Sequence, residues 1–265
     1  MRSKGRIVLI TGGSSGIGAA LALEFGRRGA DVGLVARRAA ALEEVSAQVR
    51  GLGVRSESVA ADVGDPEATR AAIERLAGSL GPIDLLVANA GIGRSQPAEE
   101  FTFDAFEETI RVNLLGAAAA IEAVLPAMLD RGRGSITVVG SLAAYRGLPQ
   151  SAAYCASKAA LASMMDALRP ELRRRGIRLT TVQPGFVTTP MIAGAAHPRP
   201  FEMSAERAAR IIADGIEGGR TKVEFPWAMV RLMRLVRDLP DFVYDRVVMR
   251  LTGLEPDASQ RRVDG

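Results

Sequence analysis

Two residues one helical turn apart, Tyr154 and Lys158, could together perform acid–base chemistry. They lie in a run that is predicted to be helical, where side chains four positions apart share a face. A free tyrosine has a pKa of about 10 and is a poor proton donor or acceptor near neutral pH. A neighbouring ammonium stabilises the phenolate and lowers that pKa. The pair therefore predicts proton transfer to or from an alcohol oxygen, with Tyr154 as the acid/base.

Two further polar residues, Ser141 and Asn113, precede this pair. Ser141 ends an expected strand, and ligands bind beyond the carboxyl ends of parallel strands, so its hydroxyl could hydrogen-bond a substrate oxygen. Asn113 lies inside a long expected helix, where its side chain competes for backbone hydrogen bonds. Each residue alone has an ordinary structural explanation, such as a chance pair, a strand-end serine or a helix kink. Their joint order downstream of a glycine-rich turn favours a catalytic set.

That glycine-rich turn joins the first expected strand to the first expected helix. Glycines let the backbone turn tightly and approach a pyrophosphate, and the following helix N-terminus offers free N–H groups. An ordinary strand–helix turn is the alternative, but it needs fewer glycines. The residues expected to hold the phosphates of a dinucleotide are Gly12, Ser14, Ser15, Gly16, Ile17 and Gly18.

The end of the second expected strand indicates which nicotinamide cofactor is bound. A fold that prefers NAD places an acidic residue there for the ribose hydroxyls, but this chain has Ala36 followed by Arg37 and Arg38. A guanidinium can hold a 2′-phosphate through paired, charge-assisted hydrogen bonds. Arg37 is the preferred candidate and Arg38 the second, although both could simply begin an exposed helix. The pattern predicts NADP(H).

Short β-branched runs alternate with longer alanine-rich runs along the chain. This alternation predicts right-handed βαβ units and a parallel sheet covered on both faces. The expected fold class is α/β, a single Rossmann-type doubly wound parallel sheet of about seven strands, in one catalytic domain over residues 1–225. The expected strands cover residues 7–11, 31–36, 54–61, 83–88, 135–140, 178–183 and 222–225, and the expected helices cover residues 16–28, 39–52, 66–80, 103–130, 153–175 and 204–217.

These motifs together resemble the short-chain dehydrogenase/reductase family over about residues 6–225. The family's loop spaces its glycines as Gly12, Gly16 and Gly18 do, and its catalytic residues match Asn113, Ser141, Tyr154 and Lys158. The resemblance implies an oxidoreductase that interconverts a carbonyl and a secondary alcohol by hydride transfer. It implies that Lys158 and Tyr154 also contact the cofactor, that Lys158 holds its ribose, and that Asn113 holds a water linking the lysine to solvent.

The resemblance implies further cofactor contacts and an assembly. An adenine-contacting pair would follow the third strand, a turn beside the cofactor the fourth, and a turn bordering the nicotinamide carboxamide the sixth. A homodimer or homotetramer would form through the two long helices around Asn113 and Tyr154. The cofactor residues implied are Asp62, Val63, Asn89, Ala90, Gly91, Pro184, Gly185, Val187 and Thr188.

Composition limits the partners. The net charge is +4 and the isoelectric point about 9.7, but the arginines are scattered among acids, so we expect no nucleic acid. The one cysteine, Cys155, excludes an intrachain disulfide, fits a cytoplasmic protein and is expected to be a buried small hydrophobe. One histidine, His197, predicts no metal site. It lies in residues 191–201, where a substrate lid is expected, although a surface role is equally open. No run approaches the roughly 18 apolar residues of a spanning helix.

Residues 226–265 exceed what the family fold needs and are expected to form a helical extension. Arg231, Arg234 and Arg237 recur every third residue among large apolar side chains, and two amphipathic helices are expected, at residues 225–240 and 242–251. The extension could pack on its own domain or a sister subunit and wall the substrate pocket, or lie peripherally on a membrane. Packing is the preferred interpretation. Two alternative functions follow, a membrane-associated reductase of a lipid-like or acyl substrate and a non-enzymatic NADP-binding sensor.

Overall fold

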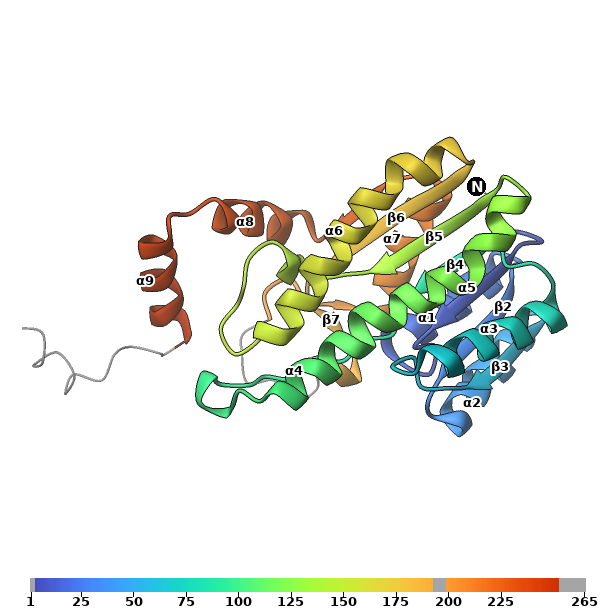
Figure 1. Cartoon of the computed structure of the whole chain (residues 1–265), viewed down its shortest axis with the longest axis horizontal. Helices are drawn as coiled ribbons and strands as arrows, with labels where there is room; N and C mark the ends of the chain where they lie inside the picture. The colour runs from blue at the N-terminus through green and yellow to red at the C-terminus, as the bar shows by residue number, and fades with distance from the viewer. Residues whose placement is uncertain (1–2, 193–198, 253–265) are drawn as a thin grey trace, which may run out of the picture.

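The computed structural model describes residues 3–192 and 199–252 of the chain. At its centre is a seven-stranded sheet in the order β3-β2-β1-β4-β5-β6-β9, and every neighbouring pair is parallel (Figure 1). This confirms the predicted α/β doubly wound sheet. Its strands are β1 (Ile7–Thr11), β2 (Asp31–Ala36), β3 (Ser56–Ala60), β4 (Leu85–Ala88), β5 (Gly134–Val139), β6 (Ile177–Pro184) and β9 (Lys222–Phe225).

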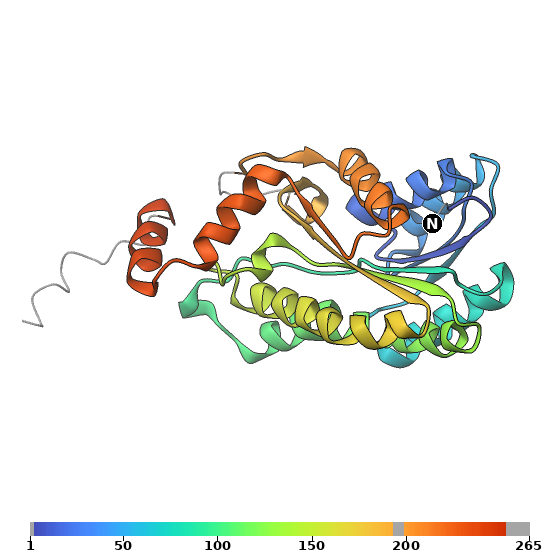
Figure 2. The same cartoon turned by 90° about the horizontal axis from the view of Figure 1, so that it is seen from above.

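Helices cover both faces of the sheet, which explains why its inner strands are almost continuous apolar runs. One layer holds α1 (Gly16–Arg27), α2 (Ala39–Arg50) and α7 (Ala205–Glu217), whose inner residues share a core with the sheet. The other holds α3 (Pro66–Leu80), α5 (Gly116–Asp130) and α6 (Ala152–Arg174). Figure 2 shows these layers on opposite sides of the sheet. With both faces covered, ligands have access chiefly at the carboxyl edge of the strands.

Local sequence sets where several helices begin. The Asp65 carboxylate accepts hydrogen bonds from the N–H groups of Glu67 (2.9 Å) and Ala68 (3.1 Å), and Pro66 supplies a first helical residue that needs no partner for its nitrogen. The Ser204 hydroxyl caps α7 by accepting from the N–H of Arg207. These caps set the residues at which α3 and α7 begin after the preceding connections.

The long helix expected over residues 103–130 is interrupted. It consists of α4 (Phe103–Ile110), a π-helical turn η2 (Arg111–Leu115) and α5, and the turn contains Asn113. Within residues 103–130 an 18-residue stretch has a mean hydropathy of 1.8, which by length and composition alone is enough to span a membrane, so the expectation that no run approaches such a length is wrong. Half of that stretch is buried within the protein, as is common for the core helix of a globular fold.

Two features lie outside the expected pattern of strands. A two-stranded sheet joins β7 (Val187–Thr188) to β8 (Met203–Ser204) at the base of the segment where a lid is expected. Residues 193–198 of that segment, with His197, lie outside the described residues. Short 3-10 turns η1 (Ala98–Glu100), η3 (Leu142–Ala144) and η4 (Pro190–Ile192) complete the described chain.

The C-terminal extension forms two helices, α8 (Trp227–Arg237) and α9 (Asp241–Thr252). In both views they lie at one end of the long axis, and α9 stands farthest from the sheet (Figures 1 and 2). The inner face of α8 buries Met229, Val230 and Met233 against Leu142, with Phe186 packed alongside. Because Leu142 follows β5 and Phe186 follows β6, the extension packs beside the carboxyl edge of the sheet. The division into domains at residue 225 stays a prediction.

Candidate active site

The glycine-rich loop after β1 has the backbone shape that its sequence predicts. Gly12 and Gly16 have φ values of +70° and +57°, a region that residues with a Cβ rarely adopt. A Cβ on Gly18 would lie 2.2 Å from the carbonyl oxygen of Gly12. The loop and the first turn of α1 are therefore packed backbone to backbone, which leaves a concave cradle that only glycines allow.

The N-terminus of α1 faces this loop without a side-chain cap. Ser15 is the N-cap, but its hydroxyl makes no capping hydrogen bond, unlike the Asp65 carboxylate at the start of α3. The first N–H groups of a helix need partners and attract anions. The cradle and the open helix end together fit the pyrophosphate of a dinucleotide.

Thr11 and Asn89 join the loop to the end of β4. The Asn89 amide donates to the carbonyl oxygens of Thr11 (3.0 Å) and Gly12 (3.3 Å), and the Thr11 hydroxyl accepts from the N–H groups of Asn89 (3.1 Å) and Ala90 (3.2 Å). The predicted turn of Asn89, Ala90 and Gly91 thus lies directly beside the phosphate cradle. Thr11, the last residue of β1, therefore joins the glycine loop to the turn after β4.

Arg38, the second candidate for the 2′-phosphate, lies over the cradle. One of its terminal nitrogens donates to the hydroxyls of Ser15 (2.8 Å) and Ser14 (3.2 Å). Arg37 points elsewhere, with its guanidinium 4.0 Å from the Asp62 carboxylate. The structure thus brings Arg38 nearer to the glycine loop, whereas Arg37 lies beside the expected adenine-contacting pair.

Asp62 and Val63 occupy the turn after β3. The Asp62 carboxylate accepts a hydrogen bond from the N–H of Gly64 (2.9 Å), and its side chain is half exposed. Val63 is buried, and a Cβ on Gly116 would lie 2.5 Å from its carbonyl oxygen. Helix α5 therefore holds the Val63 backbone in place, while Asp62 remains accessible at the sheet edge.

Asn113 is buried in the π-helical turn and fixes the chain after Gly91. Its amide donates to the Ile92 carbonyl (2.9 Å) and to the Ser157 hydroxyl (3.0 Å), and its oxygen accepts from the N–H of Ile92 (2.7 Å). Its side chain thus bonds the Ile92 backbone and α6 directly. The role implied by resemblance, holding a water near Lys158, stays a prediction.

Tyr154 and Ser141 meet at the start of α6. Burial raises the pKa of the Tyr154 phenol above its usual value, and a hydrogen bond from Ser141 acts in the opposite direction. The expected lowering of this pKa by Lys158 is therefore wrong for the cofactor-free protein, because desolvation of the phenolate dominates. The Ser141 hydroxyl also accepts from the N–H of Ala143 (3.1 Å), which sets its orientation at the start of η3.

Lys158 is buried on the same face of α6 as Tyr154. Its Nζ donates to the carbonyl oxygen of Val139 (2.9 Å) and lies 5.6 Å from the centre of the Tyr154 ring. Burial lowers the pKa of Lys158 to about 8. A Cβ on Gly91 would lie 3.4 Å from this nitrogen, so Lys158 reaches the turn that Asn89 ties to the phosphate cradle.

The turn after β6 borders the same edge. Gly185 donates its N–H to the Phe225 carbonyl (2.8 Å), and Pro184 pairs with Phe225 in the sheet. Val187 is buried in β7, and the Thr188 hydroxyl donates to the Glu202 carboxylate (2.8 Å). Ile17 is partly buried and packs against the core below the cradle.

Sequence reasoning missed Gly93, a neighbour of the Tyr154 ring. A Cβ on Gly93 would lie 3.3 Å from the Tyr154 Cδ2 atom and 3.6 Å from the Met191 sulfur. Gly93 therefore lies between the edge of the Tyr154 ring and the Met191 side chain, which is 48% exposed. Their spacing carries no motif, but a glycine two residues after Gly91 was an available signal for close approach.

Cys155 is buried next to Tyr154, as expected for a small hydrophobic residue. Its sulfur accepts a hydrogen bond from the N–H of Leu148 (3.3 Å), and burial raises the pKa of its thiol. A thiol with a raised pKa is a poor nucleophile. Among residues 3–192 and 199–252, no group of three or more His, Cys, Asp or Glu side chains is placed to hold a metal ion.

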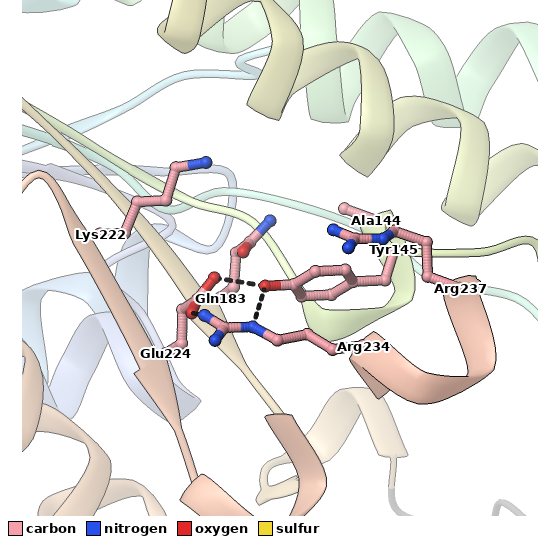
Figure 3. Close-up of a pocket in the computed structure, with 7 residues that line it drawn as sticks. All are labelled: Ala144, Tyr145, Gln183, Lys222, Glu224, Arg234 and Arg237. Atoms are coloured by element: carbon pink, nitrogen blue, oxygen red, sulfur yellow. Dashed lines mark hydrogen bonds and ion pairs between the residues drawn. The ribbon is translucent and has the colours of Figure 1, made fainter. Parts of the chain in front are cut away.

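A hollow of about 440 Å³ lies between α8 and the edge of the sheet (Figure 3). In it the Tyr145 hydroxyl donates to Glu224 (2.6 Å), and Arg234 bonds the other oxygen of the same carboxylate (2.6 Å). These contacts attach α8 to β9, so we interpret the hollow as part of the polar contact between α8 and the sheet and not as a substrate site. Its lining, which contains none of the predicted catalytic residues, consists of Ala144, Tyr145, Gln183, Lys222, Glu224, Arg234 and Arg237.

Comparison with known proteins agrees with this geometry. The sequence model of the short chain dehydrogenase family matches residues 6–199. An uncharacterized oxidoreductase of Myxococcus xanthus is 40% identical over 246 residues, which cover 93% of this chain and 97% of that protein. The crystal structure of levodione reductase has a TM-score of 0.80 at 27% identity, covering 87% of this chain and 99% of its own. L-Sorbose reductase from Gluconobacter frateurii, solved with NADPH and L-sorbose, has a TM-score of 0.78 at 27% identity, with the same coverage.

Proposed function

We propose that this chain, which belongs to the short-chain dehydrogenase family, is an NADP(H)-dependent oxidoreductase that interconverts a carbonyl and a secondary alcohol with Tyr154 as acid/base. One observation carries the proposal. The Tyr154–Lys158 face of α6 reaches Gly91, and Asn89, two residues earlier, is bonded to the glycine loop. A dinucleotide held at that loop would therefore have its reactive end beside the phenol.

The bound nicotinamide would supply or accept the hydride. In the direction of reduction, the Tyr154 phenol gives its proton to the substrate oxygen, and its raised pKa keeps that proton in place at neutral pH. The Ser141 hydroxyl can hydrogen-bond the same oxygen as negative charge develops there. Lys158, whose Nζ donates to the Val139 carbonyl and lies 5.6 Å from the centre of the Tyr154 ring, would hold the ribose of the cofactor with the same ammonium. In the direction of oxidation the phenol takes up the proton.

The preference for NADP(H) rests on charge at the end of β2. No acid follows this strand, and two arginines do: Arg37 lies beside the Asp62 carboxylate and Arg38 beside the Ser14 and Ser15 hydroxyls. The solved L-sorbose reductase was crystallised with NADPH, which supports the assignment by similarity. We propose that Arg38 holds the phosphate against the loop and that Arg37 covers it from the adenine side.

Single substitutions test the two arginines. Hydrogen bonds to charged groups contribute about 1.5–3 kcal/mol, so Arg37→Ala and Arg38→Ala should each weaken NADPH binding by roughly 10- to 100-fold. NADH, which lacks the 2′-phosphate, should bind both variants as it binds the parent. Titration calorimetry with both cofactors measures the difference. Equal losses of affinity for NADPH and NADH would exclude a 2′-phosphate contact. If only Arg37→Ala weakened NADPH binding, Arg37 and not Arg38 would hold the 2′-phosphate.

The same proposal includes assembly and location. Phe103 (71% exposed) and Leu115 (50% exposed) leave apolar surface on α4 and η2, near the helices through which a dimer or tetramer is expected. We propose a homo-oligomer that buries this surface, and light scattering of the parent and of Leu115→Glu would measure it.

The free, buried Cys155 fits a cytoplasmic enzyme, since a reducing compartment keeps thiols free.

A lipid-like or acyl substrate is the second candidate for the substrate class. It is favoured by Met191, which is 48% exposed and lies on the other side of Gly93 from the Tyr154 ring, and by Phe201, which is 56% exposed at the other end of the same segment. A non-enzymatic NADP-binding sensor would have no use for a buried lysine beside the phenol. A panel of short and long-chain ketones and aldehydes, assayed by NADPH oxidation, would separate these possibilities. The sensor interpretation requires cofactor binding without turnover of any member.

A further inference from the structure

Helix α8 has two faces, and only one of them is used by the fold. Met229, Val230 and Met233 are buried against the body of the protein. On the opposite face Trp227, Arg231 and Leu235 follow one another every fourth residue, so they form one stripe along the helix. Trp227 is 72% exposed and Leu235 is 64% exposed, with Leu232 beside them at 47%. This face is apolar with a cation at its centre.

Helix α9 carries the same combination. Phe242 is 76% exposed and Val247 is 42% exposed, and Arg246 and Arg250 are exposed on the same helix. Large aromatic and aliphatic side chains interleaved with arginines are typical of helices that lie in a bilayer interface. The exposed apolar and arginine side chains of both helices are together called the tail surface, which consists of Trp227, Arg231, Leu232, Leu235, Phe242, Arg246, Val247 and Arg250.

The arginines of the extension divide into two groups. Arg234 pairs with Glu224 (2.6 Å) and Arg237 with Asp238 (2.8 Å), so their charges are already compensated. Within the part of the chain that the structure describes, Arg231, Arg246 and Arg250 form no ion pair. Asp245, exposed on α9, likewise forms no ion pair among the described residues, so the extension carries three unpaired arginines against one unpaired aspartate. The tail surface is therefore net positive beside exposed apolar side chains, which complements an anionic surface with an apolar interior.

Two other occupants fit less well. A second copy packed symmetrically on this surface would place like arginines near one another, because an isologous interface pairs each patch with itself. Residues 253–265 of the same chain are mostly polar and include Glu255, Asp257 and Asp264, so they offer little apolar area to cover Trp227 and Leu235. A phospholipid surface offers both anionic headgroups and acyl chains.

We propose that the tail surface docks the protein peripherally on a bilayer that contains anionic phospholipids. The body of the protein holds the extension in place for this. Arg146 donates to the Arg237 carbonyl (3.0 Å) and the Leu239 carbonyl (2.7 Å), pairs with Asp241 (2.6 Å) and stacks on the Tyr244 ring at 4.2 Å. Because α8 packs on Leu142, the residue after Ser141, the extension lies at the same end of the molecule as the proposed active site.

The chain carries its own reporter, since Trp227 is its only tryptophan. The full-length protein is mixed with vesicles of phosphatidylcholine alone and with vesicles that also contain phosphatidylglycerol. Docking predicts a blue shift of tryptophan emission and flotation with the anionic vesicles, and little of either with phosphatidylcholine alone. No blue shift and no flotation with anionic vesicles would overturn the proposal. The measurement needs no turnover, so docking and the proposed reaction can fail independently.

Variants locate the contact. Each juxtamembrane cation strengthens binding about fivefold, so Arg231→Glu should weaken vesicle affinity by roughly tenfold or more, and Leu235→Glu should also do so. Arg175→Glu, at the exposed arginine that follows α6, makes the same change of charge away from the tail surface and should leave affinity within about twofold. NADPH binding and circular dichroism show that each variant is folded. Equal losses in Arg231→Glu and Arg175→Glu, or a solution dimer that Leu235→Glu dissociates, would overturn the proposal in favour of net charge or a second copy.

Discussion

Burial shifts the pKa values of the two titratable groups of the site, Tyr154 and Lys158, in opposite directions. The pKa of Tyr154 is raised, so the phenol keeps its proton, and the pKa of Lys158 is lowered to about 8, so its ammonium is close to losing one. Both shifts have the same cause, because burial disfavours the charged form of each group. At neutral pH the free protein therefore holds a neutral phenol beside a cationic lysine, the pair that reduction of a carbonyl requires.

A pH profile of carbonyl reduction tests this pair. Lys158 is charged below about pH 8 and neutral above it, so kcat/KM for reduction should be level below pH 7 and fall as the pH rises through about 8. Lys158→Arg keeps a positive charge throughout this range, since a guanidinium ionises only above about 12. We expect a lower plateau in that variant, with its decline displaced toward the ionisation of Tyr154. An unchanged midpoint near pH 8 in Lys158→Arg would assign the titration to another group.

At the scale of elements, the contact between α1 and the glycine loop makes the cofactor cradle. A Cβ on Gly18 would meet the Gly12 carbonyl at 2.2 Å and the Asn89 amide at 2.6 Å, so Gly18→Ala must push the loop away from the helix. Overpacking of this kind costs about 1–3 kcal/mol. We predict a melting temperature lower by roughly 2–12 °C and NADPH binding weakened by about tenfold or more, measured by calorimetry.

Gly78→Ala is the matched control. Gly78 lies within α3, and a Cβ there would meet nothing within 4 Å. Alanine is the better helix former, so this variant should be as stable as the parent or more stable by up to about 1 kcal/mol, with NADPH affinity unchanged. If both glycine variants lose affinity equally, the close packing of the loop on α1 is not what shapes the cradle.

The attachment of α8 and α9 depends on one side chain. Arg146 caps the carbonyl oxygens at the end of α8, pairs with Asp241 and stacks on Tyr244, and its side chain is only 17% exposed. Charged hydrogen bonds of this kind contribute about 1.5–3 kcal/mol. Arg146→Ala should therefore speed amide hydrogen exchange in α8 and α9 by roughly 10- to 100-fold and leave the sheet unchanged.

Arg246→Ala controls for loss of an arginine in the extension, because Arg246 is exposed on α9 and, among the described contacts, has no hydrogen bond or ion pair. Mass spectrometry of exchanged peptides should show parent-like rates in this variant. Unchanged exchange in Arg146→Ala would show that the apolar contacts of Met229 and Met233 with Leu142 hold the extension without help.

At the scale of the whole molecule, the parallel sheet could be read from the sequence because its strands are buried on both faces. The five residues of β1 are all buried, and runs of this kind stand out against the amphipathic helices between them. The glycine loop was equally readable, since a positive φ at Gly12 and close approach at Gly18 restrict those positions to one residue type. Where local geometry dictates the residue, sequence is informative.

Other features depended on contacts between distant segments. The π-helical turn at Asn113 reflects the side chain's bonds to Ile92 and Ser157, and α8 has an inner face only because Leu142 and Phe186 meet it. The direction of the Tyr154 pKa followed burial, which a helical spacing of four residues does not reveal. The positions of Arg37 and Arg38 relative to the cradle likewise required the folded loop.

The central claim is that Tyr154 serves a hydride transfer between NADP(H) and a carbonyl or alcohol carbon. NADPH labelled with deuterium at the transferred position, incubated with a panel of ketones and aldehydes, allows direct detection of labelled alcohol by mass spectrometry. We predict label in at least one product of the parent enzyme and a loss of about 100-fold or more in Tyr154→Phe, which still binds NADPH. Absence of label from every product of the parent, or transfer that persists undiminished in Tyr154→Phe, would contradict the account.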